Sequence, residues 1–200
     1  TKTFSTAIGS TDSYWKLVRE QFPFREERVP MNAANLSPSP RPVYEQVSQL
    51  TLDIDTDCSF PNRAKFRDLL EESRRKVAVQ LGVSPDEIAL VRNTSEGNNT
   101  INNGLSLKRG DEVVLWDQNH PTNNGAWDVR AARYNLVIRR VSTPERPSDP
   151  EQLIDVFAKA LGPRTRLLAI THLSNVSGVR LPVRQLCHVA HQRGIAVHVD

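Results

Sequence analysis

Residues 112–133 read EVVLWDQNHPTNNGAWDVRAAR, in which an apolar run passes through a short polar turn into a segment with helical spacing. The same alternation recurs along the chain from residue 88 onward. Runs that are apolar on both faces and separated by helices are typical of parallel strands covered on both sides. The sequence therefore predicts an α/β fold with a mostly parallel, doubly wound sheet between two helical layers. The other expected strands are IALV (88–91), LVIRRV (136–141), RLLAITHL (166–173) and IAVHVD (195–200), and the expected helices cover 94–107, 122–133, 151–161 and 183–192.

The first 81 residues have a different pattern. Helical spacing predicts a short amphipathic helix over 12–22, a second helix over 42–53 and a longer one over 64–81. The Pro-rich stretch 38–42 separates an extended segment from the second helix, and Gly82 is placed to end the third.

Composition excludes several classes of protein. The 200 residues include 26 Lys and Arg against 23 Asp and Glu, a formal net charge of +3 that is dispersed along the chain, so a nucleic-acid-binding surface is not expected. The longest apolar runs are far shorter than the roughly 20 residues of a membrane-spanning helix. Cys58 and Cys187 have no metal-binding spacing and leave the cellular compartment open, with the cytoplasm as the default.

In such sheets ligands bind outside the carboxyl ends of the strands, so the residues after each apolar run form the candidate site. The segment RNTSEGNN (92–99) leads from an expected strand into a helix, where free backbone N–H groups and the helix dipole favour an anion. The hydroxyls of Thr94 and Ser95 add donors, which makes this segment a candidate phosphate site. An ordinary helix start capped by Asn93 or Thr94 explains the same residues.

Three further strand ends carry polar side chains. His120 follows an apolar run and precedes Pro121, where an imidazole can stack on a planar ring or transfer protons; the alternative is a surface histidine. Asn175 offers an amide donor or marks a simple turn. Asp200 ends an apolar run, and a carboxylate there needs a cation, a metal or a protonated heteroaromatic nitrogen, unless it reaches water at the rim of the sheet.

Four segments occur in a fixed order along the chain: VRNTSEGNN (91–99), NHPTNNGAW (119–127), THLSNVSG (171–178) and VHVD (197–200). Together they resemble the first half of pyridoxal 5'-phosphate (PLP) enzymes of fold type I, specifically the class V aminotransferase group. That group includes cysteine desulfurases and isopenicillin N epimerase-like proteins. The resemblance covers about Met31 to Asp200 and implies PLP as the cofactor.

The resemblance implies a role for the residues at the strand ends. Thr94, Ser95 and the main-chain amide of Glu96 hold the cofactor phosphate. His120 stacks on the pyridine ring, and Asp200 pairs with the pyridinium nitrogen. A protonated ring nitrogen makes the ring an electron sink that stabilises a carbanion at the substrate Cα, so His120 and Asp200 are the expected catalytic residues.

Other residues are assigned by the same resemblance. Asn175 contacts the hydroxyl side of the ring. Asn32 and Asn35 lie in a loop that lines the substrate mouth, unless they form a plain turn. The Schiff-base lysine and the arginine for the substrate carboxylate are expected beyond Asp200, in a chain about twice as long, or else the protein is inactive as written.

The domain organisation is also an implication of the resemblance. Residues 1–35 are expected to form an N-terminal segment that packs with a small domain, and residues 36–200 to form the front part of the PLP-binding large domain. The remainder of the large domain and the C-terminal small domain are expected beyond residue 200. Two copies are expected to form a homodimer, since active sites of this group usually lie between two subunits.

The implied activity is conversion of an amino acid or another amino-group substrate through a Cα carbanion, of the aminotransferase or epimerase type. A cysteine desulfurase or C–S lyase is the alternative within the group. Cys58 and Cys187 are interpreted as structural, which favours the first type. Two other classes stay open: a metal-dependent hydrolase that uses His198 and Asp200, with histidines from neighbouring strand ends, and a non-catalytic PLP-fold binding protein.

Overall fold

The structure, a computed structural model, describes residues 11–25, 27–31 and 36–200. The chain divides into two compact units, Thr1–Ala89 and Leu90–Asp200. This division falls at residue 89, whereas the domain limit expected from the sequence falls at residue 35. The expected domain organisation stays a prediction.

The described part of the first unit is helical. Its elements are α1 (Thr11–Glu20), α2 (Arg41–Thr56), α3 (Phe60–Leu81) and the short 3-10 helix η1 (Pro85–Glu87). The three expected helices are present. Helix α3 begins earlier than expected because the Ser59 hydroxyl caps it, accepting a hydrogen bond from the Asn62 amide. Gly82 ends α3 in the left-handed conformation, with φ 69°.

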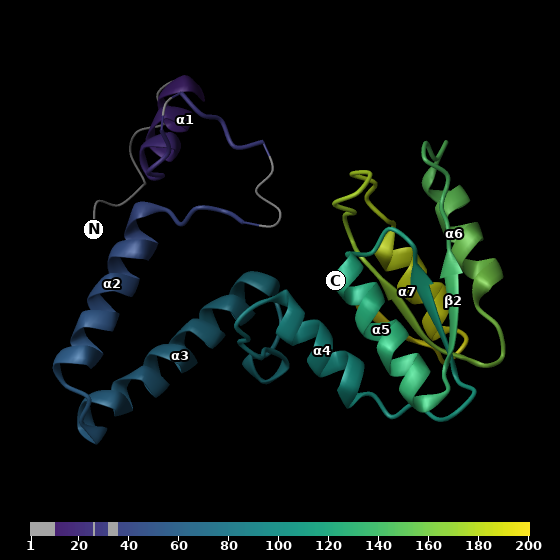
Figure 1. The fold of residues 1–200 in the computed structure, drawn as a ribbon. Helices are drawn as coiled ribbons and strands as arrows, with labels where there is room; N and C mark the ends of the chain where they lie inside the picture. Colours follow the sequence, from purple (N-terminus) through teal and green to yellow (C-terminus); the bar gives the residue numbers. More distant parts are fainter. Residues whose placement is uncertain (1–10, 26, 32–35) are drawn as a thin grey trace. The chain divides into compact units, whose positions relative to one another are not determined.

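The second unit is built on a four-stranded sheet in which every pair of neighbouring strands is parallel (Figure 1). The strands are β1 (Glu112–Trp116), β2 (Val137–Val141), β3 (Thr165–Ile170) and β4 (Ala196–Val199), in the spatial order β2-β1-β3-β4. The helices are α4 (Thr94–Gly104), α5 (Pro121–Tyr134), α6 (Pro150–Ala160) and α7 (Val183–His191). The predicted parallel α/β fold is therefore confirmed.

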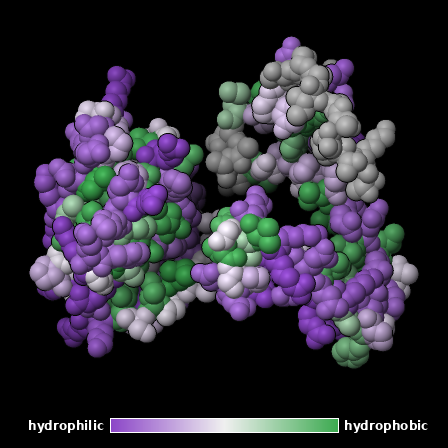
Figure 2. Space-filling model, turned by 180° about the vertical axis from the view of Figure 1, so that it is seen from behind, coloured by the Kyte–Doolittle hydropathy of each residue, from purple (hydrophilic) through white to green (hydrophobic). Residues whose placement is uncertain are grey.

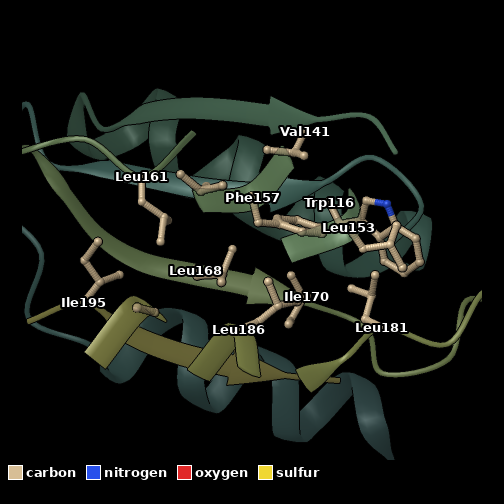
Figure 3. Packing of buried hydrophobic residues seen from close by; sticks show 12 residues of the cluster. Trp116, Val141, Leu153, Phe157, Leu161, Leu168, Ile170, Leu181, Leu186 and Ile195 are labelled. Atoms are coloured by element: carbon tan, nitrogen blue, oxygen red, sulfur yellow. The ribbon is translucent and has the colours of Figure 1, made fainter. Parts of the chain in front are cut away.

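Apolar side chains cover both faces of the sheet. On one face Trp116 and Phe157 are fully buried, with their rings edge to face and 6.5 Å between the centroids, among side chains from β3, α6 and α7 (Figure 3). On the other face Trp127 of α5 is buried in one cluster with Val113 and Leu115 of β1. The unit therefore has the three layers, helix on sheet on helix, that the sequence predicts.

One expected strand is missing from this sheet. Residues 88–91 (IALV) pair with none of the four strands, and Leu90 and Val91 are 44% and 49% exposed. The apolar run indicates burial, but a strand also needs a neighbour that completes its backbone hydrogen bonds. The described part of the chain offers no such neighbour, so the prediction of a strand at 88–91 is wrong there.

Apolar residues also lie on the surface, among the hydrophilic residues of both units (Figure 2). In the first unit, α2 has no buried residue at all. Within the described residues, every helix is too short or too polar to cross a membrane.

Candidate functional site

The sheet contains a point at which the chain reverses its direction of travel. From β1 the chain moves to β2 through α5 on one face, and from β2 it returns past β1 to β3 through α6 on the other face. Ligands of doubly wound sheets bind at such a switch point, outside the carboxyl ends of the strands. The candidate site therefore lies between the loops that follow β1 and β3, residues 117–120 and 171–182.

Asn119 connects these two loops. Its side chain is buried, and its Nδ2 donates to the Ala169 carbonyl (2.9 Å) while its Oδ1 accepts from the Thr171 hydroxyl (3.1 Å). A buried amide is stable only when its donors and acceptors are paired, as they are here. These bonds hold the turn after β1 against the end of β3 and place His120 at the rim of the switch point.

His120 begins α5 as its N-cap residue. The Thr122 main-chain N–H donates to His120 Nδ1 (3.2 Å), and the Thr122 hydroxyl lies 2.7 Å from the same nitrogen. Because Nδ1 accepts the amide hydrogen bond, the proton of the neutral imidazole is on Nε2. The ring is held at the first turn of the helix and is exposed, so it can stack on a planar ligand.

Asp200 follows β4 and is tied to β3 through its main chain. Its N–H donates to the Ile170 carbonyl, and its carbonyl accepts from the His172 N–H, both at 2.9 Å. Its half-buried carboxylate has one hydrogen-bond partner in the described chain, the Nδ2 of Asn123, 3.4 Å from Oδ2. Because Asn123 lies in the first turn of α5, the structure brings Asp200 to the helix start that His120 caps.

Two buried polar atoms in this region have no hydrogen-bond partner within the described chain: Oδ1 of Asn123 and Nδ1 of His198 on β4. Asn123 is only 1% exposed. Burial lowers the pKa of His198, and the carboxylate of Asp200 opposes this with a smaller effect. These atoms retain hydrogen-bonding capacity around the end of β4 and the start of α5.

The N-terminus of α4 is the candidate anion site. Asn93 caps it and accepts a hydrogen bond from the Glu96 N–H (2.9 Å), so the helix cap is confirmed and the Glu96 amide is already used. The Glu96 carboxylate accepts from the Arg92 N–H (2.6 Å) and lies 3.2 Å from Arg92 Nε, which lowers the pKa of Glu96. The main-chain N–H groups of Thr94 and Ser95 have no partner in the described chain and are free to bind an anion.

The loop after β3 carries Asn175. Ser174 Oγ donates to the Gln118 carbonyl (3.2 Å), and Ser177 Oγ hydrogen-bonds to the Gln118 side chain, so this loop is anchored on the turn after β1. Asn175 lies in a turn, is exposed, and has no hydrogen-bond partner in the described chain. The turn is confirmed, and the role of Asn175 as a ligand contact stays a prediction.

The expected site residues fall into separate groups. His120 and Asp200 meet at the start of α5. No hydrogen bond or ion pair between described residues joins them to the N-terminus of α4, although α4 and α5 are in contact. Asn32 and Asn35 lie outside the described residues.

Sequence reasoning missed Asn119, Asn123 and Thr171. A signal for Asn123 was present, because it follows His120 by three residues and such residues share one face of a helix. Nothing local indicates that Asn119 bonds to β3, since that bond joins residues 50 apart in the chain.

The geometry gives less support to the two alternative functions, a metal-dependent hydrolase and a cysteine desulfurase. Among residues 11–25, 27–31 and 36–200, no three His, Cys, Asp or Glu side chains lie together as metal ligands, so His198 and Asp200 form no such group with their described neighbours. Cys187 is half-buried, and burial raises its pKa, which agrees with a structural role. Cys58 is exposed in the link between α2 and α3, which corrects its interpretation as a structural side chain.

Relatives with curated functions match most of this chain. The sequence model of the aminotransferase class V family matches residues 33–200. Isopenicillin N epimerase of Amycolatopsis lactamdurans is 30% identical over 189 residues, which cover 93% of this chain and 47% of that protein. A probable cysteine desulfurase of Methanothermobacter thermautotrophicus is 31% identical over 189 residues, which cover 92% of this chain and 46% of that protein. The chain thus spans about half the length of these curated relatives.

Solved structures agree with these relatives. A mutant of C-DES with glycine covalently linked to the PLP cofactor has a TM-score of 0.84 at 25% identity, covering 91% of this chain and 49% of that chain. The apo structure of cysteine desulfurase from Thermococcus onnurineus NA1 has a TM-score of 0.76 at 26% identity, covering 92% of this chain and 46% of that chain. With the family match over most of the chain and the shared fold, the chain belongs to the class V aminotransferase family.

Proposed function

We propose that this chain supplies the front part of the cofactor site of a PLP-dependent enzyme that acts on an amino acid or another amino-group substrate. The observation that carries the proposal is the position of Asp200, which follows a strand and lies at the helix start capped by His120. The relatives support it, because the similar C-DES structure contains PLP.

The residues present fit this cofactor. The carboxylate of Asp200 has one long hydrogen bond and retains acceptor capacity for a protonated ring nitrogen. The free N–H groups of Thr94 and Ser95, at a helix N-terminus, suit a phosphate. His120 presents an exposed planar ring, and Asn175 presents an amide without a partner in the described chain.

When bound, PLP supplies a protonated aromatic ring that withdraws electrons from the substrate Cα. Asp200 would keep the proton on the ring nitrogen, because a nearby carboxylate favours the protonated, charged form of that nitrogen. His120 would hold the ring by stacking on it, and Asn175 would contact the hydroxyl side of the ring. Thr94 and Ser95 bind the phosphate and thereby fix the far end of the molecule.

Aminotransferase or epimerase chemistry is the first candidate for the reaction. An isopenicillin N epimerase matches 93% of this chain. Cysteine desulfurase is the second candidate, favoured by a relative and a solved structure with that name. The raised pKa of Cys187 disfavours it as a nucleophile, whereas Cys58 is exposed and available to act as one.

We also propose that two copies of the chain form a homodimer. On α2, Val43 and Val47 are one turn apart and are 48% and 58% exposed, and the half-buried Leu50 and Ile54 continue the same apolar stripe. A second copy that covers this stripe removes it from water. Light scattering on Val47→Glu tests this: we expect a monomer mass, and a retained dimer mass contradicts the proposal. The matched control is Gln49→Glu, which adds the same charge on another face of α2 and leaves a dimer.

The visible absorption spectrum of the full-length protein tests the proposed function. We expect a yellow protein whose absorption band is bleached by borohydride. A colourless protein that takes up no added PLP contradicts the proposal. His120→Ala weakens PLP binding, whereas His191→Ala, at the exposed end of α7, leaves it unchanged. Release of sulfide from added cysteine separates the desulfurase from the aminotransferase or epimerase.

A further inference from the structure

We infer that Arg130 is a positioning residue for the cofactor, because it fixes the helix with the proposed phosphate site to the helix that His120 begins. This inference rests on the proposed function. Neither the strand-end pattern nor the resemblance to the family assigns Arg130 a role. It lies in the second half of α5, away from the residues proposed to touch PLP.

The guanidinium of Arg130 is buried where α4 and α5 meet. The residue is 8% exposed, and its Nη2 donates to the carbonyl of Leu105, which caps the C-terminus of α4. Its Cζ also lies 5.7 Å from the ring centroid of Trp127 and 6.0 Å from that of Tyr134. The cation is therefore held by two rings of α5 and bonded to the last turn of α4.

Within the described residues, no carboxylate pairs with this buried charge. None of the ion pairs between described residues includes Arg130, and its Nε and Nη1 have no hydrogen-bond partner there. A buried cation without a counter-ion is costly, so another negative group must offset it. The group that faces Arg130 is the C-terminal end of α4, which carries the partial negative charge of the helix dipole.

Helix α4 carries the effect of Arg130 to the proposed phosphate site. It spans 11 residues, so its two ends are about 16 Å apart. A short helix moves as a rigid body, and fixing its C-terminus on α5 also sets where the N–H groups of Thr94 and Ser95 lie relative to His120. A shift of about 1 Å in a positioning group lowers the reaction rate by up to about 100-fold in a well-ordered active site. Loss of the Arg130 anchor should therefore weaken binding at the phosphate end of the cofactor.

The test compares PLP with pyridoxal, which differs only by lacking the phosphate. Equilibrium dialysis with the full-length protein gives both affinities for each variant. Arg130→Met removes the charge and the donors but keeps an apolar stem, and we expect its PLP affinity to fall about tenfold while its pyridoxal affinity changes less than about twofold. Arg130→Lys keeps the charge and N–H donors that can reach the Leu105 carbonyl, so its loss of PLP affinity should be smaller than that of Arg130→Met. The matched control is Arg133→Met on the exposed part of α5, which should bind both ligands as wild type does.

Equal losses for PLP and pyridoxal in Arg130→Met overturn the inference, because Arg130 then supports the whole site, and unchanged affinities overturn it as well. Should circular dichroism show that Arg130→Met is unfolded, the same comparison in Arg130→Lys decides. A wild-type protein that binds pyridoxal as tightly as PLP contradicts the phosphate site of the proposed function, and the role of Arg130 falls with it. If wild type and Arg130→Met both bind PLP more tightly than pyridoxal, and by the same factor, the role of Arg130 is refuted while the phosphate site of the proposed function stands.

Discussion

Replacement of Asp200 by Asn removes the negative charge that the proposed function places beside the ring nitrogen, and it leaves the shape of the side chain almost unchanged. The main chain at this position keeps its hydrogen bonds to Ile170 and His172, each 2.9 Å long, so the end of β4 stays in place. The Asn123 side chain, whose Nδ2 donates to the Asp200 carboxylate at 3.4 Å, can donate to the amide oxygen of the new side chain in the Asp200→Asn variant. The substitution therefore tests the charge and not the fold.

The size of the effect follows from the environment of Asp200. A hydrogen bond to a charged group contributes about 1.5–3 kcal/mol. The carboxylate is only half-buried, so solvent screening places the value in the lower part of this range. A loss of about 2 kcal/mol corresponds to a roughly 30-fold weaker affinity for PLP.

Equilibrium dialysis of PLP against the full-length wild type and Asp200→Asn measures this loss. The matched control is Asp155→Asn on α6, outside the candidate site, because the exposed carboxylate of Asp155 has no hydrogen-bond or ion-pair partner in the described chain. We expect a change of less than about twofold for the control, since a distant exposed charge is screened by salt. Equal affinities of Asp200→Asn and wild type for PLP contradict a direct contact between the Asp200 carboxylate and the ring nitrogen. Equal losses in both variants show that net charge, and not a direct contact, governs binding.

Three further predictions concern stability, measured by urea unfolding. Arg139→Met removes the cation that lies 3.1 Å from the buried carboxylate of Glu112, and it should lower the free energy of unfolding by about 2 kcal/mol. This loss is smaller than for a fully buried pair because Arg139 is half-exposed. The control Arg140→Met breaks an exposed ion pair and should lower the free energy of unfolding by less than about 1 kcal/mol, so equal losses in the two variants would contradict the prediction. Phe157→Ala opens a cavity in the core and should cost about 3–5 kcal/mol, so a cost below about 1 kcal/mol is inconsistent with full burial. Because burial lowers the pKa of His198, the unfolded state takes up its proton at a higher pH than the folded state, and stability falls as the pH drops below about 6.5. His198→Gln should show a smaller fall between pH of about 7.5 and about 5.5, and an unchanged pH dependence would refute this role.

The fold was predictable where local sequence and tertiary burial agree. The run EVVLW is buried at all five positions of β1, and the Pro121 that follows His120 is suited to the first turn of α5. The run IALV (88–91) is equally apolar, but apolarity does not specify a pairing partner, and the strand is missing from the sheet. The helix η1 was overlooked because its capping box, Ser84 with Glu87, is a short-range signal outside any apolar periodicity.

The site was predictable to the extent that chain topology determines it. The rule that ligands bind at the carboxyl ends of strands pointed to His120 and Asp200, and the structure brings both to the start of α5. The role of Asn123 depends on a contact between residues 77 apart in the chain, which no local pattern encodes. For Glu96 a short-range contact overrides the prediction. Its main-chain N–H, which the resemblance assigns to the phosphate, donates to the side chain of the helix cap Asn93.

A crystal structure of the full-length protein grown with PLP shows whether Asp200 and the start of α4 bind opposite ends of one PLP molecule. We expect the ring nitrogen to lie within hydrogen-bond distance of the Asp200 carboxylate, while the phosphate of the same molecule accepts hydrogen bonds from the main-chain N–H groups of Thr94 and Ser95. A structure in which these two places face different cavities, or in which PLP binds elsewhere, contradicts this prediction.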